Sequence, residues 1–271
     1  MLSIFALLHA LKYADFSGII GIILACVLFA VTYSRLKTAR AALRFQWLLL
    51  FTMLSTPAIL YVAYYSHKLP ETEAFYEFRS WRGTELLVAF TGGVAGVVTT
   101  FLHRTLLPIP LACLVVVALI PFAKPLFGPI PDSDFQYRWN GPVCLQSTAS
   151  TCGPASLATI MNRLGIKVTE LEIARAAYSY EGGTEAWYLA RYARKRGLKA
   201  EFILRKGFSP DISLPTIAGV SLGSVGHFIP ILAREGDFYI TGDPGHGESR
   251  LTLEQLLKIY RFTGFYMPVS K

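Results

Sequence analysis

Hydrophobic positions divide the chain into two unlike parts. Up to about residue 127, long apolar runs alternate with short polar stretches, whereas shorter apolar periods follow from residue 140 onward. Because about 20 apolar residues cross a bilayer, four of these runs are candidate membrane spans: 17–34, 45–65, 86–102 and 106–127. The first part is therefore predicted to be an all-α transmembrane region of about four helices.

The third and fourth candidate spans are less regular in sequence than the first two. The third contains Gly92 and Gly96, a G-x-x-x-G spacing that lets two helices approach closely. Prolines interrupt the fourth run. A signal peptide is the alternative for the first run, but three further runs follow it, which favours a retained helix.

A linker and one small domain are expected after the apolar runs. Residues 128–140 are dense in Pro, Gly and Asp and lack periodicity, which is typical of a linker. Residues 141–271 are enough for a single core. Helices are expected over 153–164, after a capping box at Thr169–Glu172, from a cap at Thr184, and after a second box at Thr252–Gln255. Strands are expected at 199–204, 214–220, 227–234, 237–243 and 262–269, so the pattern predicts an α+β domain with an antiparallel sheet.

Composition agrees with this division. The chain of 271 residues is 53% hydrophobic and 16% charged, with a formal net charge of +8. No basic stripe of the kind that binds phosphates is present, so nucleic acid is not expected as a partner. The absence of a G-x-x-x-x-G-K-[ST] motif argues against a nucleotide partner. Basic residues cluster between the first two runs, at Arg35, Lys37, Arg40 and Arg44.

That basic cluster predicts an orientation. Lys and Arg next to spans favour the cytoplasmic side, so residues 35–44 are placed there. Four spans then put the C-terminal domain on the non-cytoplasmic side of the membrane. We expect a multi-pass protein of the cytoplasmic membrane of a bacterium, in contact with the lipid bilayer.

Cysteine chemistry is the most specific signal in the second part. Cys152 precedes Gly-Pro at the start of the helix expected at 153–164, and a helix N-terminus favours the thiolate form of a cysteine. An imidazolium at His227 would favour that form further. The antiparallel strands 227–234 and 237–243 place Asp243 near His227, where a carboxylate fixes the imidazole tautomer. Gln146 offers an amide donor for a developing oxyanion.

Plainer interpretations exist for each of these residues. A lone cysteine is more often a buried apolar residue, and His246 in its Gly-rich loop is equally a substrate-side residue or a solvated turn. Metal binding by Cys144, Cys152, His227 and His246 lacks any paired spacing. A disulfide between Cys144 and Cys152 that silences the nucleophile is a further hypothesis.

Together, these residues resemble a known family. The segment "LQSTASTCGPASLATI", with Gln146 six residues before Cys152, and "GHFIPILAREGDFYITGDPGHG" are similar to the C39 cysteine peptidases. The resemblance covers nearly all of 141–271. It implies a papain-like fold, with Cys152 as nucleophile, His227 as general base and acid, Asp243 as its orienter and Gln146 as oxyanion donor. It also implies peptide substrates with small residues, typically Gly-Gly, before the scissile bond.

Two departures narrow what the resemblance implies. Thr151 stands where many exporter-linked members have Asp, and Pro154 gives a "CGPA" form associated with members outside the exporters. We therefore expect a membrane-anchored cysteine peptidase, needing no cofactor, that acts on a peptide or protein and is served by a separate exporter. Alternatives are a papain-like acyltransferase and a catalytically idle module that binds leader peptides.

Overall fold

A computed structural model describes residues 15–66, 70–106, 108–223 and 225–271, which form two compact units. Of the described residues, those within 15–71 and 82–127 form unit 1, and those within 72–81 and 128–271 form unit 2. Two parts of the predictions lie outside the described residues: the start of the chain, on which a signal peptide depends, and Leu107 of the fourth run.

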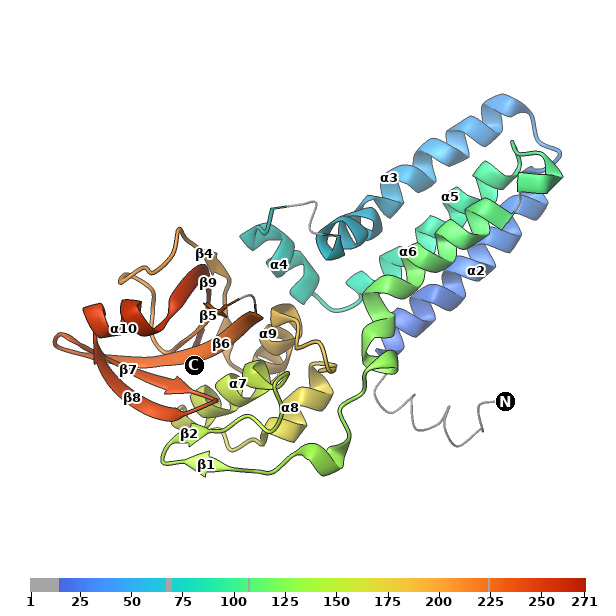
Figure 1. Cartoon of the computed structure of the whole chain (residues 1–271). Coiled ribbons are helices and arrows are strands. Elements are labelled where there is room, and N and C mark those ends of the chain that lie inside the picture. Colours follow the sequence, from blue (N-terminus) through green and yellow to red (C-terminus); the bar gives the residue numbers. More distant parts are fainter. Residues whose placement is uncertain (1–14, 67–69, 107, 224) are drawn as a thin grey trace. The chain divides into compact units, whose positions relative to one another are not determined.

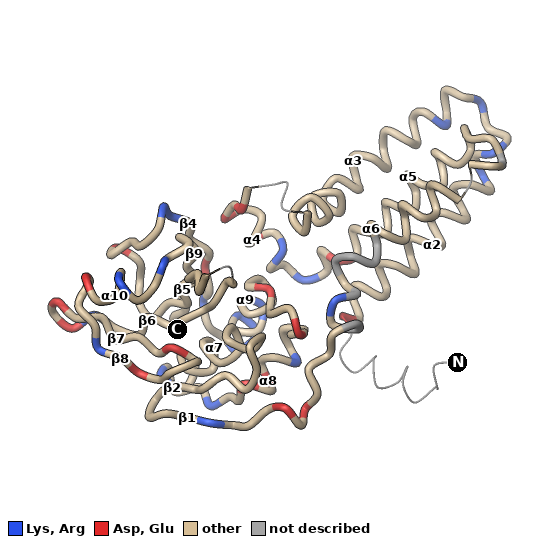
Figure 2. The backbone as a smooth tube through the Cα atoms, viewed as in Figure 1, with Lys and Arg blue, Asp and Glu red and all other residues tan. Residues whose placement is uncertain are grey.

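Unit 1 is helical. Its elements are α2 (Phe16–Leu36), α3 (Ala41–Tyr65), the 3₁₀ helix η1 (Thr84–Val88), α5 (Ala89–Thr99), the 3₁₀ helix η2 (Arg104–Leu106) and α6 (Pro108–Phe127) (Figure 1). Within the described residues, α2 and α3 are long and apolar enough to cross a membrane, whereas the apolar helices at Thr84–Thr99 and Pro108–Val117 are shorter. By length and apolar composition, the described residues thus contain two candidate spans where four were predicted. Figure 2 shows the basic residues of the α2–α3 loop at one end of this unit.

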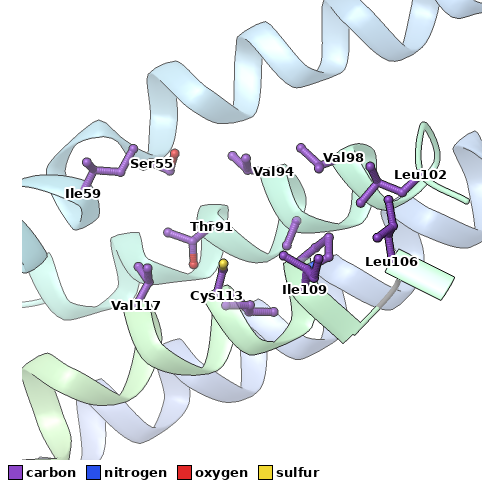
Figure 3. Close-up of a pocket in the computed structure, with 13 residues that line it drawn as sticks. Ser55, Ile59, Thr91, Val94, Val98, Leu102, Leu106, Ile109, Cys113 and Val117 are labelled. Atoms are coloured by element: carbon purple, nitrogen blue, oxygen red, sulfur yellow. The ribbon is translucent and has the colours of Figure 1, made fainter. Parts of the chain in front are cut away.

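Close approach of α2 and α5 depends on glycine, as the G-x-x-x-G spacing predicts. A Cβ added at Gly92 would lie 1.8 Å from the Ala25 carbonyl oxygen, and one at Gly96 would lie 2.7 Å from that of Phe29. On the other side of α5, a cavity of about 450 Å³ opens between α3, α5 and α6 (Figure 3). Its wall is almost wholly apolar, and Thr91 and Cys113 are among the few lining residues whose side chains carry an oxygen or a sulfur atom.

Unit 2 is an α+β unit. Its helices are α4 (Glu73–Ser80), the 3₁₀ helix η3 (Asp132–Asp134), α7 (Cys152–Arg163), α8 (Glu170–Ala176), α9 (Ala186–Lys195) and α10 (Leu253–Ile259). Its strands are β1 (Trp139–Asn140), β2 (Val143–Cys144), β3 (Lys199–Ala200), β4 (Ile203–Leu204), β5 (Thr216–Leu222), β6 (Val225–Glu235), β7 (Phe238–Asp243), β8 (Gly247–Thr252) and β9 (Arg261–Ser270).

The main sheet is antiparallel, with the order β3-β9-β5-β6-β7-β8 and β4 also paired to β9. Helix α7 packs on β6, and α8 and α9 pack on α7 (Figure 1). Buried apolar side chains of β5, β6, β9 and α10 form a core cluster that includes Ile229, Leu256 and Tyr266. The capping box at Thr252–Gln255 is confirmed at the start of α10.

Some local predictions were wrong or incomplete. Thr184 does not cap α9, which begins at Ala186 with Glu185 as its N-cap, because the Thr184 hydroxyl is hydrogen-bonded to Ser179 instead. The strand expected at 199–204 is split into β3 and β4, and β8 was not predicted. The β8 sequence, GESRLT, has no apolar alternation that predicts a strand, and the strand forms by pairing along β7.

The segment before β1 is packed onto unit 2. Ile130 and Phe135 are buried against Ala174 of α8. Arg175 donates hydrogen bonds to the Asp132 carboxylate and to the Ile130 carbonyl. The proline- and glycine-rich stretch therefore has a fixed path along α8, which leads the chain towards β2 and α7.

Helix α4 comes from the polar loop that follows α3, yet it belongs to unit 2. Its Tyr76 side chain is buried. The Tyr76 ring lies with centroids 5.2–5.9 Å from three aromatic rings of unit 2: Phe265, Phe202 and Trp187. Arg191 of α9 donates to the last backbone carbonyls of α4, at Arg79, Ser80 and Trp81. A cation at this end also complements the helix dipole.

Candidate active site

Cys152 is the first residue of α7 and is 9% exposed. Gly153, the next residue, lets α7 pack closely against α9 and β6, because a Cβ there would lie 2.9 Å from Leu189 and 3.3 Å from Phe228. The Ser156 hydroxyl, one turn later, donates to the Phe228 carbonyl of β6 at 3.0 Å. Small and hydroxyl residues in the first turns of α7 therefore hold Cys152 beside the strand that carries the histidine.

His227 lies between Cys152 and Asp243. Its Nε2 atom is 3.1 Å from Asp243 Oδ1, and its side chain lies close enough to Cys152 for the two groups to interact. Because Nε2 faces the carboxylate, Nδ1 is the nitrogen left for the thiol. The β6–β7 hairpin brings His227 and Asp243 together, and their side chains are only 9% and 5% exposed. The structure brings these three predicted residues together.

Asp243 is held by three donors. Besides the imidazole, the Gly245 N–H donates to Oδ1 at 2.8 Å and the Tyr260 hydroxyl donates to Oδ2 at 2.9 Å. Burial would raise the pKa of the carboxyl group, but these hydrogen bonds and the His227 charge outweigh it and hold the pKa well below its usual range. Tyr260 was not predicted, because nothing in its local sequence marks it as a partner of Asp243.

The protonated form of His227 is favoured at neutral pH. Burial alone would lower its pKa, yet the hydrogen bonds and charges of Asp243 and Cys152 raise the pKa from 6.5 to about 9. An imidazolium beside a cysteine stabilises the thiolate, which is the nucleophilic form of the thiol. The arrangement can therefore support a thiolate–imidazolium pair steadied by a carboxylate.

Gln146 lies between β2 and α7, on a segment that is hydrogen-bonded to the turn after Asp243. Its backbone N–H donates to the Pro244 carbonyl at 2.9 Å, and its side-chain Nε2 donates to the Thr148 carbonyl at 2.9 Å. One N–H of the amide remains for a further acceptor. Its Oε1 is buried without a hydrogen-bond partner among the described residues. Within the part of the chain that the structure describes, the Gln146 amide is not hydrogen-bonded to Cys152, His227 or Asp243, so its expected role as oxyanion donor concerns the reaction intermediate.

The remaining candidates lie at the margins of this site. His246 is 83% exposed, with Nδ1 3.4 Å from Asp243 Oδ2. Cys144 is buried, and burial together with the Glu170 charge raises the pKa of its thiol to about 12. Cys144 and Cys152 are both free thiols. Among the described residues, no group of three His, Cys, Asp or Glu side chains could hold a metal ion.

Comparisons with known proteins concern the same part of the chain. The model of the Peptidase C39 family matches residues 140–271. Over 129 residues, the chain is 31% identical to an uncharacterised protein of Methanothermobacter thermautotrophicus, which covers 48% of this chain and 88% of that protein. It is 23% identical over 122 residues to the probable functional amyloid protease FapD of Pseudomonas aeruginosa, covering 42% of this chain and about half (54%) of FapD.

Solved structures are more distant. A double glycine motif protease from an AMS/PCAT transporter, crystallised in complex with the leader peptide, is 23% identical and covers 48% of this chain and 90% of that chain. The TM-score of this comparison is 0.41.

Proposed function

Because residues 140–271 belong to the peptidase C39 family, whose members are cysteine proteases, we propose that this chain hydrolyses a peptide bond with Cys152 as the nucleophile. The observation that carries the proposal is the position of His227, which is hydrogen-bonded to Asp243 and interacts with Cys152. A structural cysteine has no need of an imidazole that is itself oriented by a buried carboxylate.

The reaction would proceed through a thioester. The Cys152 thiolate attacks the carbonyl carbon of the scissile bond, and the carbonyl oxygen takes the negative charge. The backbone N–H of Cys152 and the free N–H of the Gln146 amide donate to that oxygen. As the C–N bond breaks, the His227 imidazolium gives its proton to the leaving amine. Neutral His227 then takes a proton from water, whose oxygen attacks the thioester and releases the acid and the Cys152 thiolate.

Peptides with small residues before the scissile bond are the proposed substrates, with leader peptides as the leading class. This assignment rests on the family, and a separate exporter would supply or remove the peptide. The membrane region would hold the peptidase unit close to where such a peptide emerges from the bilayer.

A quenched fluorescent peptide with a Gly-Gly pair before the scissile bond tests the activity. The full chain in detergent micelles should cleave it, and Cys152→Ala should not. Mass spectrometry of the products with an added primary amine separates hydrolysis from acyl transfer, which would give an amide. Binding of the peptide by both proteins with cleavage by neither would instead indicate the idle module and refute the proposal.

Chain connectivity supports a proposal for the side of the membrane on which unit 2 lies. Unit 2 takes α4 from the loop after α3 and the remainder from the chain after α6. Both connections must then leave the bilayer on one side, opposite to the α2–α3 loop. The basic residues of that loop favour the cytoplasm, so we place unit 2 on the non-cytoplasmic side.

Labelling of sealed vesicles tests this orientation. A membrane-impermeant maleimide should modify Cys152 in right-side-out vesicles before lysis, with Cys152→Ala as the matched control. Protection of Cys152 until lysis would contradict the orientation without affecting the proposed chemistry.

A further inference from the structure

Glu170 is a buried carboxylate that the proposed mechanism does not use. It is the first residue of α8 and is 2% exposed. Burying a carboxylate is costly unless it is hydrogen-bonded. Both of its oxygens are satisfied by one residue: the Ser147 backbone N–H donates to Oε1 at 2.8 Å and the Ser147 hydroxyl donates to Oε2 at 2.5 Å.

Ser147 is the neighbour of Gln146, so these bonds fix the backbone that carries the amide. In the preceding peptide unit, the Gln146 N–H donates to the carbonyl of Pro244, which follows Asp243. The Ser147 hydroxyl also accepts from the Gln136 N–H at 3.0 Å. The short segment at 146–147 is thus tied both to the Asp243 turn and to the N-terminus of α8.

We propose that Glu170 is a positioning residue that sets the place of the Gln146 amide in the oxyanion site. This inference rests on the proposed peptidase function. A carboxylate suits the position because it accepts two hydrogen bonds at once, from an N–H and an O–H of the same residue. A glutamine there has a single acceptor oxygen, so its amide would have to donate to the Ser147 hydroxyl in place of accepting from it. The 146–147 segment would then lose both of the charge-assisted hydrogen bonds that hold it.

The expected effect of Glu170→Gln is a loss of transition-state stabilisation with little loss of substrate binding. Removing an oxyanion donor outright lowers kcat by about 10²–10³-fold. A displaced donor should cost less, and we expect kcat to fall about 10–100-fold while KM changes less than about 3-fold. Ser147→Ala keeps the N–H bond and should lower kcat less.

Three measurements separate positioning from general damage. Alkylation of Cys152 by iodoacetamide displaces iodide and forms no oxyanion, so Glu170→Gln should react at the wild-type rate. A peptide aldehyde ending in Gly-Gly forms a thiohemiacetal whose oxygen occupies the oxyanion site, so its affinity should fall with kcat. Glu172→Gln is the matched control, because Glu172 is on the same helix but binds Tyr192 and Arg196 at the surface.

A double-mutant cycle gives the decisive outcome. If Glu170 acts through Gln146, then Gln146→Ala combined with Glu170→Gln should be as slow as Gln146→Ala alone. Three results would each overturn the inference. Glu170→Gln could keep the wild-type kcat, the double variant could show the product of the two single effects on kcat, or alkylation of Cys152 could slow as much as kcat does. Should Glu170→Gln fail to fold, the same cycle with Ser147→Ala decides. If wild type itself neither cleaves peptide nor binds the aldehyde, the proposed function fails and this inference with it.

Discussion

Replacing Asp243 with asparagine removes one negative charge beside His227 while nearly keeping the shape of the side chain. The asparagine oxygen can still accept from His227 Nε2 and from the Gly245 N–H, and its amide can donate to the Tyr260 hydroxyl, which also accepts hydrogen bonds. The change therefore isolates the electrostatic contribution of the carboxylate from the packing around it.

The size of the effect follows from the pKa of His227. A rise from 6.5 to about 9 corresponds to about 3 kcal/mol of preference for imidazolium over imidazole. Asp243 and Cys152 share this preference, and an adjacent opposite charge typically contributes about 1–3 pH units. In Asp243→Asn we expect the pKa of His227 to fall by about 1–2 units, because the charge of the carboxylate is lost while the hydrogen bond to residue 243 and the interaction with Cys152 remain.

The pH dependence of kcat/KM measures this change directly. The raised pKa means that wild-type His227 loses its proton only as the pH passes about 9, and activity should decline there. In Asp243→Asn, the decline should begin at lower pH, so the variant should lose more activity at pH 8.5 than at pH 6. The stability that Asp243 gives to imidazolium is fully present below pH 6.5 and is lost as the pH rises through about 9. An alkaline limb of the variant within 0.3 units of the wild-type limb would refute this reasoning.

Three further changes test other parts of the structure. Gln146→Ala should lower kcat by about 10²–10³-fold while leaving alkylation of Cys152 unchanged, and an unchanged kcat would exclude the amide from the oxyanion site. Tyr260→Phe removes a hydrogen bond to a charged group and should lower the unfolding free energy at pH 7 by about 1.5–3 kcal/mol, measured by urea unfolding. That loss should be the same at pH 7 and pH 5, where Asp243 is ionised in the folded and the unfolded chain, and it should shrink only as the pH falls through the lowered pKa of Asp243. A loss that has already disappeared at pH 5 would contradict the assignment. Tyr76→Ala should destabilise unit 2 by about 3–5 kcal/mol, whereas a wild-type melting curve would show that α4 is dispensable.

Local signals in the sequence were sufficient for the elements near Cys152. The Pro154 and Gly165 frame predicted α7 to within one residue at each end, because the signals that start and stop a helix act within a single turn. The capping residue Thr169 likewise begins α8, where its side chain accepts from the Glu172 N–H. By contrast, Thr184 has the right composition for a cap but is hydrogen-bonded elsewhere, because a tertiary contact can replace a local one.

The sequence by itself determined which groups could react: a cysteine at a helix N-terminus, and a histidine and an aspartate that one antiparallel hairpin brings together. These placements depend on spacing within a helix or a hairpin, which the chain specifies over a few residues. Only the tertiary structure decided which groups support them. Tyr260 reaches Asp243 from beyond α10, Glu170 reaches Ser147 from α8, and α4 joins unit 2 from a loop of the first part of the chain. Such partners are selected by the packing of whole elements, for which a short stretch of sequence carries no periodicity or motif.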